Sequence, residues 1–279
     1  VAAALAQADL AVVENLCTIP LNLPAARVVA GVLAGRPAVV HHHDPPWQRE
    51  RFAHVTELPP DDPAWRHVTI NRRTEHQMAE RGISATTIYN PFEVDAPPGD
   101  RAGTRRLLNV APDELLVAHP VRAISRKDIP RALQVCEDLD ATYWLTGPTE
   151  EGYEATLRDI LDRAACRVLR AQTPSVADIY AAADAVVFTS VWEGFGNPPV
   201  EAAVHGRPAI VSHYPVAEEL RQLGFRWFDP GDLDPVRAHL ISGNADLLEQ
   251  NRRIVEEHLS MEVIGAQIAE LLGDMGIRA

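Results

Sequence analysis

The most informative segment of this 279-residue sequence is VFTSVWEGFGNPPVEA, residues 187–202. Its pattern predicts a buried strand, a loop with two glycines and the start of a helix. Asn197 suits the N-cap of that helix and Pro198 its first position. In open parallel sheets, ligands bind at the carboxyl ends of the strands. We therefore expect the loop to present backbone N–H groups and the positive end of the helix dipole to an anion.

Two carboxylates flank this loop, with Glu193 inside it and Glu201 one turn into the helix. Carboxylates are poor ligands for phosphate but accept hydrogen bonds from sugar hydroxyls. The segment thus predicts a ligand that combines a diphosphate with a polyol, and Gly194 and Gly196 leave room for its approach. A simpler alternative for Glu201 is that it complements the helix dipole. A dinucleotide fingerprint fits poorly, because its third glycine is absent.

On both sides of this segment, short apolar runs alternate with amphipathic stretches. This alternation predicts right-handed βαβ units, and therefore an α/β protein with parallel sheets. Helices are expected at 129–139, 153–164 and 245–276. Strands are expected at 10–13, 38–40, 67–70, 85–89, 115–118, 142–145, 167–169, 185–188 and 209–211.

A proline- and glycine-containing stretch after Asn90-Pro91 predicts a hinge near residues 91–100. We expect a first Rossmann-like domain over 1–93, a second over 94–262, and a C-terminal helix over 263–279 that packs back on the first. The second domain has about six strands between residues 115 and 228, a full doubly wound sheet. The first has only about four, so we expect it to be N-terminally incomplete by about 60–110 residues.

A second group of candidate residues lies in the loop that follows the first strand of the second domain. Arg122 and Lys127 are five residues apart there, and both are predicted to bind a diphosphate. Lys127 is the sole lysine among 26 basic residues, which favours a specific role for it. Arg126 and Arg131 are interpreted instead as a solvated basic start of the next helix.

The composition excludes several classes of protein. A net charge of −13 disfavours binding to nucleic acid or to anionic membranes. No apolar run of about 18 residues predicts a transmembrane helix. Three cysteines without a CxxC motif indicate reduced thiols and a cytoplasmic protein. Arginine-rich, lysine-poor usage is typical of a GC-rich genome, and we expect a bacterial source.

A third feature is the histidine run His41-His42-His43, at the end of an expected strand and followed by Asp44. Alternate residues of a strand point to opposite faces, and no second set of ligands stands out, so no metal site is expected. His43 is selected as the histidine that reaches a ligand between the domains.

Together these motifs resemble the retaining GT-B glycosyltransferases of the large family four, over nearly the whole chain. The spacing of Glu193 and Glu201 is similar to that family's glutamate, seven residues, glutamate signature. Arg122 and Lys127 match its diphosphate-binding pair, His43 its first-domain histidine, and Asn90-Pro91 its hinge. The resemblance implies two Rossmann-like domains that face a cleft and a hexose transfer with retention of configuration.

The resemblance also implies roles for the candidate residues. Arg122 and Lys127 would neutralise the leaving diphosphate, and Glu201 would accept hydrogen bonds from the donor ribose. His43 would contact a sugar hydroxyl, and Gln172-Thr173 would lie near the nucleobase. The hexose would be held by Glu193, by the adjoining Gly194 and by the backbone of Phe195, Gly196 and Asn197. The donor would be a UDP-, GDP-, ADP- or dTDP-linked sugar and the acceptor a small molecule or glycan, with no cofactor or metal.

Two departures from the family pattern stand out. Asp128 follows the lysine where the family usually has glycine, and the glycine-rich loop after the first strand of the first domain is absent. We expect Asp128 to turn away and cap the next helix.

Three other functions stay open: a sugar-nucleotide epimerase, a non-catalytic nucleotide-sugar-binding subunit and a metal-dependent glycosyltransferase. The last would use an Asp-x-Asp motif, but Asp138/Asp140 and Asp232/Asp234 are better interpreted as turns and caps.

Overall fold

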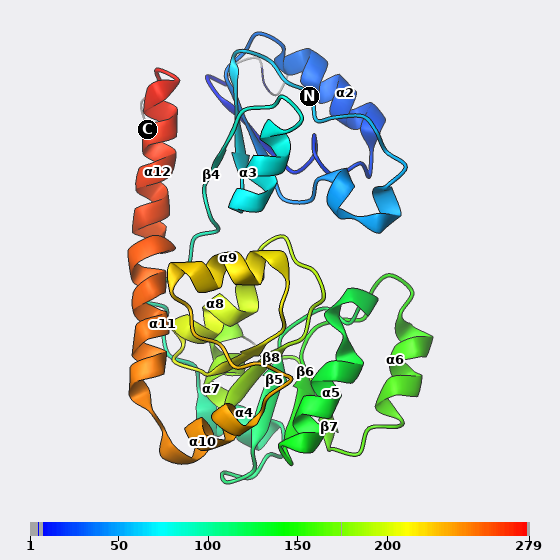
Figure 1. Cartoon of the computed structure of the whole chain (residues 1–279), viewed down its shortest axis with the longest axis vertical. Coiled ribbons are helices and arrows are strands. Elements are labelled where there is room, and N and C mark those ends of the chain that lie inside the picture. The colour runs from blue at the N-terminus through cyan, green and yellow to red at the C-terminus, as the bar shows by residue number, and fades with distance from the viewer. Residues whose placement is uncertain (1–4, 6–7, 174, 278–279) are drawn as a thin grey trace. The chain divides into compact units, whose positions relative to one another are not determined.

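The computed structural model describes Leu5, residues 8–173 and residues 175–277 of the chain. It divides the chain into two compact units, coloured by residue number in Figure 1. The first unit comprises Val1–Pro91 and Glu262–Ala279, and the second comprises Phe92–Met261. Among the described helices, none is both long enough and apolar enough to cross a membrane.

The first unit is built on a parallel four-stranded sheet in the order β1-β2-β3-β4. Its core joins the sheet to α2, through Leu33 of the helix and Val13, Val40 and Trp65 of the strands. The elements are β1 (Ala11–Glu14), α2 (Leu23–Leu33), β2 (Ala38–His42), β3 (Trp65–Thr69), α3 (Arg72–Ala79), β4 (Ala85–Thr87) and α12 (Met261–Asp274), with two short 3₁₀ turns, η1 (Pro46–Gln48) and η2 (Glu50–Phe52).

The second unit contains a parallel five-stranded sheet in the order β7-β6-β5-β8-β9. Its strands are β5 (Leu116–His119), β6 (Thr142–Leu145), β7 (Val168–Leu169), β8 (Ala185–Phe188) and β9 (Ala209–Val211). The expected sixth strand is reduced to a single bridge between Ile210 and Phe228. The order is that of a doubly wound sheet, because it reverses between β5 and β8. In sheets of this kind, ligands bind between the loops that leave the carboxyl ends of the strands on either side of the reversal point.

Helices cover this sheet, and its central strands therefore have no exposed residue. Every residue of β5, β6, β8 and β9 is buried, as expected for a parallel sheet covered on both faces. Figure 1 shows the helices around it, among which α4 packs on α7 and α8 packs on α11. They are α4 (Arg101–Leu107), α5 (Ile129–Asp138), α6 (Glu154–Leu161), α7 (Val176–Ala182), α8 (Asn197–Val204), α9 (Pro215–Leu223), α10 (Asp234–Ser242) and α11 (Ala245–His258), with the 3₁₀ turn η3 (Ser125–Lys127).

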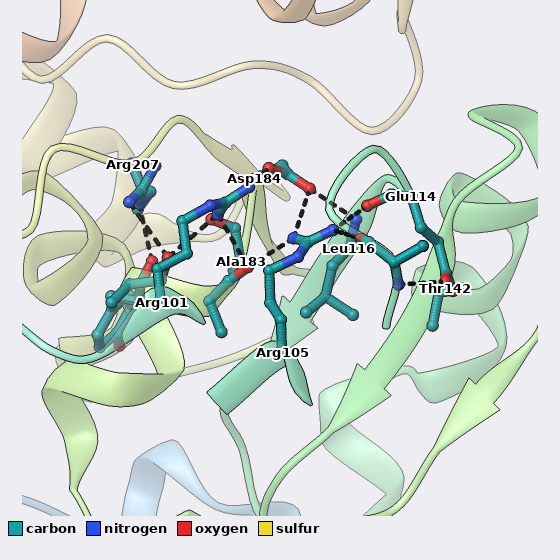
Figure 2. Close-up of polar contacts among 12 residues, drawn as sticks. Arg101, Arg105, Glu114, Leu116, Thr142, Ala183, Asp184 and Arg207 are labelled. Atoms are coloured by element: carbon teal, nitrogen blue, oxygen red, sulfur yellow. Dashed lines mark hydrogen bonds and ion pairs between the residues drawn. The ribbon is translucent and has the colours of Figure 1, made fainter. Parts of the chain in front are cut away.

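An arginine network holds the amino edge of this sheet together (Figure 2). Asp184, just before β8, accepts a hydrogen bond from the Leu116 backbone N–H at 2.8 Å and ion pairs from Arg101 at 2.5 Å and Arg105 at 3.2 Å. Arg101 and Arg207 also donate to backbone carbonyls at the end of α7. These arginines therefore satisfy the last carbonyls of α7, and their role is structural.

Candidate functional site

A buried ion-pair cluster lies at the reversal point of the second sheet. Lys127, from the loop after β5, donates from Nζ to Glu193 Oε1, from the loop after β8. Arg126 contacts the other carboxylate oxygen, Oε2, at 2.5 Å. The Lys127 and Glu193 side chains are each only 9% exposed. The structure thus brings together two residues that sequence analysis placed in separate motifs.

Arg126 was wrongly interpreted as part of a solvated helix start. Its side chain is 21% exposed, and besides Glu193 it contacts the Trp192 carbonyl at 2.9 Å. Its place next to Lys127, in the loop after β5, is the one sequence feature that links Arg126 to the site. Arg131 also has a structural contact, because its guanidinium donates to the Pro230 carbonyl at 2.5 Å.

The cluster carries a net positive charge, since two cations surround one carboxylate. Burial alone would raise the pKa of Glu193, but the charges of Lys127 and Arg126 outweigh it and hold that pKa below its usual range. Burial lowers the pKa of Lys127, and neighbouring arginines lower it further, although Glu193 opposes the shift. A net positive charge that is largely shielded from solvent favours the binding of an anion.

Thr189, at the end of β8, connects the loop after β8 to the loop after β5. Its hydroxyl lies 3.0 Å from the carbonyl oxygens of both Lys127 and Asp128. Asp128 itself adopts the left-handed conformation, with φ 47°, and its side chain caps α5 by accepting from the Arg131 backbone N–H. Asp128 therefore turns into the helix start as expected, because aspartate is one of the few residues that tolerates this conformation and also caps.

The helix that follows the glycine loop begins one residue earlier than predicted. Asn197 is the first residue of α8 and Gly196 is its N-cap, so the expected Asn197 cap is wrong. Gly196 has φ 99°, and a Cβ there would lie 2.2 Å from the hydroxyl of Tyr214. That hydroxyl donates to the Phe195 carbonyl at 3.3 Å. Only glycine fits this position, because conformation and space both exclude a side chain.

Glu201 lies on α8 and is bound by a residue that sequence analysis did not select. The buried Tyr180 hydroxyl, from α7, donates to Glu201 Oε2. Burial raises the pKa of Glu201, and the Tyr180 hydrogen bond partly offsets the shift. The structure gives Oε1 no partner among the described residues, which leaves this oxygen for a ligand hydroxyl.

The remaining predicted residues of this unit lie outside the buried cluster. Arg122 is half exposed and pairs with Glu150 at 2.8 Å. Gln172 is exposed, and Thr173 donates its hydroxyl to the Ser175 carbonyl at 2.9 Å. Both lie in the loop after β7, at the carboxyl edge of the sheet. Because the strands are parallel, this loop leaves the sheet at the same edge as Lys127 and Glu193.

His119, at the end of β5, is a further buried group that sequence analysis missed. Its Nδ1 lies 2.8 Å from the Tyr143 hydroxyl. Burial, followed by the charge of Lys127, lowers the pKa of His119 to about 3. The imidazole is therefore neutral at physiological pH and does not act there as a proton donor.

In the first unit, His43 belongs to a group of three convergent side chains. Its Nε2 lies 3.1 Å from Glu14 Oε2 and 3.3 Å from His41 Nδ1. The Asn15 side chain fixes the turn, because its Oδ1 accepts from the backbone N–H groups of His43 and Asp44. His41 and His43 share a face, and Glu14, which sequence analysis did not select, lies opposite His41 in the sheet register.

The Asp-x-Asp matches form turns and helix ends, as expected. Asp138 is the last residue of α5, and Asp140 has φ 54° in the turn that follows. Asp232 accepts from the backbone N–H of Asp234, the first residue of α10.

Known proteins resemble this chain in sequence and in fold. A family model described as Glycosyl transferases group 1 matches residues 124–242, which include Lys127, Glu193 and Glu201. Mannosylglucosylglycerate synthase of Thermotoga maritima is 25% identical over 237 residues, which are 70% of this chain and 55% of that protein. The enzyme of the same name from Petrotoga mobilis is 24% identical over 271 residues, which are 78% of this chain and 62% of that protein.

The chain thus spans less than two thirds of the length of these curated relatives. Among solved structures, Anabaena Alr3699/HepE in complex with UDP and glucose aligns with a TM-score of 0.79 and 22% identity. The alignment covers 98% of this chain and 81% of that one. The chain therefore has the fold of the GT-B glycosyltransferases, and its second unit contains the segment that matches the group 1 glycosyl transferases.

Proposed function

We propose that this chain is a glycosyltransferase that moves a hexose from a nucleoside-diphosphate sugar to an acceptor, with retention of configuration and without a metal ion. The observation that carries the proposal is the Lys127–Glu193–Arg126 cluster at the reversal point of the sheet. There the buried Lys127 and the partly buried Arg126 share one carboxylate close to the start of α8. This combination suits a diphosphate joined to a sugar.

The cluster suggests how the donor would be divided among these residues. Lys127 and Arg126 would receive the diphosphate, and Arg122 is exposed enough to exchange Glu150 for a phosphate oxygen. Glu193 would accept hydrogen bonds from hexose hydroxyls. As the sugar–phosphate bond breaks, negative charge grows on the diphosphate, and positioned cations stabilise that change without solvent reorganisation.

The nucleoside end and the other sugar contacts follow from the remaining candidates. Glu201 would bind the ribose through Oε1, while Tyr180 holds Oε2. The loop at Gln172 and Thr173 would lie beside the base, and His43 would contact a sugar hydroxyl. The names of the relatives support a hexose, since they include mannosylglucosylglycerate synthase, and Alr3699/HepE was solved with UDP-glucose.

The first test is the melting temperature of the full chain with UDP, GDP, ADP or dTDP, followed by transfer assays with the matching sugar donors. A ligand that binds only the folded state raises the melting temperature. We expect one diphosphate to stabilise the chain more than its monophosphate does. If none of the four nucleotides raises the melting temperature, the proposal is contradicted.

The second test removes the lysine. Lys127→Met should weaken diphosphate binding by about 1.5–3 kcal/mol and monophosphate binding by much less, because a charge-assisted contact to the second phosphate is lost. Arg163→Met is the matched control, since it removes one positive charge from an exposed position of the same unit. Equal losses for both nucleotides would remove Lys127 from the diphosphate site.

A further inference from the structure

The convergence of Glu14, His41 and His43 has a geometry that the proposed transfer reaction does not explain. Glu14 ends β1, His41 is its register partner on β2, and His43 lies two residues further on the same face. Their ligand atoms are Glu14 Oε2, His41 Nδ1 and His43 Nε2, and these form a triangle with sides of 2.9, 3.1 and 3.3 Å.

These distances are those of hydrogen bonds, and they also match the spacing of neighbouring ligands of one metal ion. With metal–ligand bonds of about 2.0–2.1 Å, ligand atoms lie about 3.3 Å apart in a tetrahedral site and about 2.9 Å apart in an octahedral one. The donor set is two imidazoles and one carboxylate, which favours zinc and similar first-row transition ions over magnesium or calcium. We infer that Glu14, His41 and His43 bind one divalent transition-metal ion of the zinc type.

The surroundings hold two of the three ligands in place. The Asn15 side chain accepts from the backbone of His43 and Asp44 and donates to Asp44 Oδ2 at 3.0 Å, while Arg49 pairs with Asp44. His41 sits in the sheet with 23% of its side chain exposed. Glu14 is 61% exposed, so the site is open to solvent and the ion would retain positions for water or a substrate oxygen.

The middle histidine of the run is excluded from this site. His42 points to the other face, where it is buried, with Nδ1 2.6 Å from the Thr18 hydroxyl and Nε2 2.8 Å from His67. His41 Nε2 is likewise buried and has no hydrogen-bond partner in the described part of the chain. Metal binding to His41 would therefore use Nδ1, the atom that already faces Glu14 and His43.

The experiment is a titration of the full, metal-free chain with Co²⁺, followed by absorption spectroscopy, with Zn²⁺ as competitor. We expect one equivalent to bind, with d–d bands of a nitrogen and oxygen site, no thiolate charge-transfer band and complete displacement by Zn²⁺. Glu14→Gln and His41→Gln should each weaken binding by at least about tenfold. The exposed Glu14 makes its variant safe for folding, which circular dichroism would check.

The matched control is His213→Gln. His213 is also flanked by two carboxylates, Glu218 at 2.6 Å and Asp229 at 2.9 Å, but they bind opposite ring nitrogens and cannot share an ion with it. Co²⁺ affinity should not change in this variant. Absence of saturable binding, equal loss in the control, or unchanged affinity in Glu14→Gln would each overturn the inference. All of these readouts are independent of transfer activity.

Discussion

Glu193 is the residue on which the proposed chemistry depends most directly, and its charge can be removed without changing its shape. Glu193→Gln should abolish transfer and leave nucleoside-diphosphate binding intact or tighter, because two cations then face the phosphates with no carboxylate between them. The same variant should lose up to about 3–5 kcal/mol of stability, since buried charges lose their partner. Kinetics, calorimetric titration and unfolding curves measure the three effects.

Glu256→Gln is the control for this variant, because Glu256 pairs with Arg252 on α11 at 2.8 Å, outside the cluster. It should retain both transfer and binding. A Glu193→Gln protein whose nucleotide affinity falls as far as its activity would show that Glu193 contacts the nucleotide rather than the hexose.

His119 makes the stability of the chain sensitive to acid. Its folded pKa is about 3, against an ordinary value of 6.5, so below pH 6.5 the unfolded chain takes up a proton that the folded chain excludes. Stability should therefore fall as the pH decreases from 6.5 towards 3, and His119 should contribute no pH dependence above this window. Scanning calorimetry of the wild type and His119→Asn compares the slopes. The variant should be less acid-sensitive, and identical slopes would contradict this account.

For individual residues, the sequence predicted which side chains belong to the candidate site better than it predicted which of them contact one another. Lys127, Glu193 and Glu201 could be selected from their motifs. The pairing of Lys127 with Glu193, and the role of Arg126, depend on two loops that are 66 residues apart in the chain. Glu14 was missed for a similar reason, because the register that places it opposite His41 is a property of the folded sheet.

The start of α8 is the element whose geometry is most restricted. Gly196→Ala should destabilise the chain and reduce transfer, because it adds a Cβ 2.2 Å from the Tyr214 hydroxyl to a residue with φ 99°. Gly206→Ala is the control: its φ is 61° and nothing lies within 4 Å of the added carbon. The stability of that variant should fall by only about 1–2 kcal/mol, which is the cost of a left-handed conformation for alanine.

Denaturant unfolding of both variants separates conformational strain from the clash. Gly196→Ala should be the less stable of the two, and Tyr214→Phe in the same chain should recover part of the difference. If the two alanine variants are equally stable, the Tyr214 contact does not restrict the loop.

Most elements could be predicted from alternating apolar runs. The ends of β6, β8 and β9 were predicted as well, whereas the ends of several other elements were not. The nine strands appear near the expected residues, since buried parallel strands read as short apolar runs. The expected sixth strand of the second sheet is one bridge, between Phe228 and Ile210 of the edge strand β9. The one-residue shift at Asn197 reflects the left-handed Gly196, which no local pattern reveals.

For the whole molecule, the proposed transfer should not require a metal ion. Treatment with EDTA should leave the rate unchanged, because Lys127, Arg126 and the start of α8 already supply positive charge to the leaving diphosphate. Added Zn²⁺ should instead slow transfer. An ion bound at Glu14 and His41 would also occupy His43 Nε2, and His43 is the residue proposed to contact a sugar hydroxyl. Rates after dialysis, with and without Mg²⁺, Mn²⁺ or Zn²⁺, provide the measurement. Loss of transfer on chelation and its recovery with Mg²⁺ would indicate a metal-dependent reaction.

Because Lys127 is the chain's one lysine, the candidate donor site contains the molecule's only ε-amine. Reductive methylation with ¹³C-formaldehyde would therefore introduce a single side-chain reporter there without mutagenesis. Its chemical shift would report the charge state of the amine as pH is varied and as Glu193 or a phosphate becomes its partner. Its rate of labelling would report how often the buried nitrogen opens to solvent, and a bound diphosphate should slow that rate.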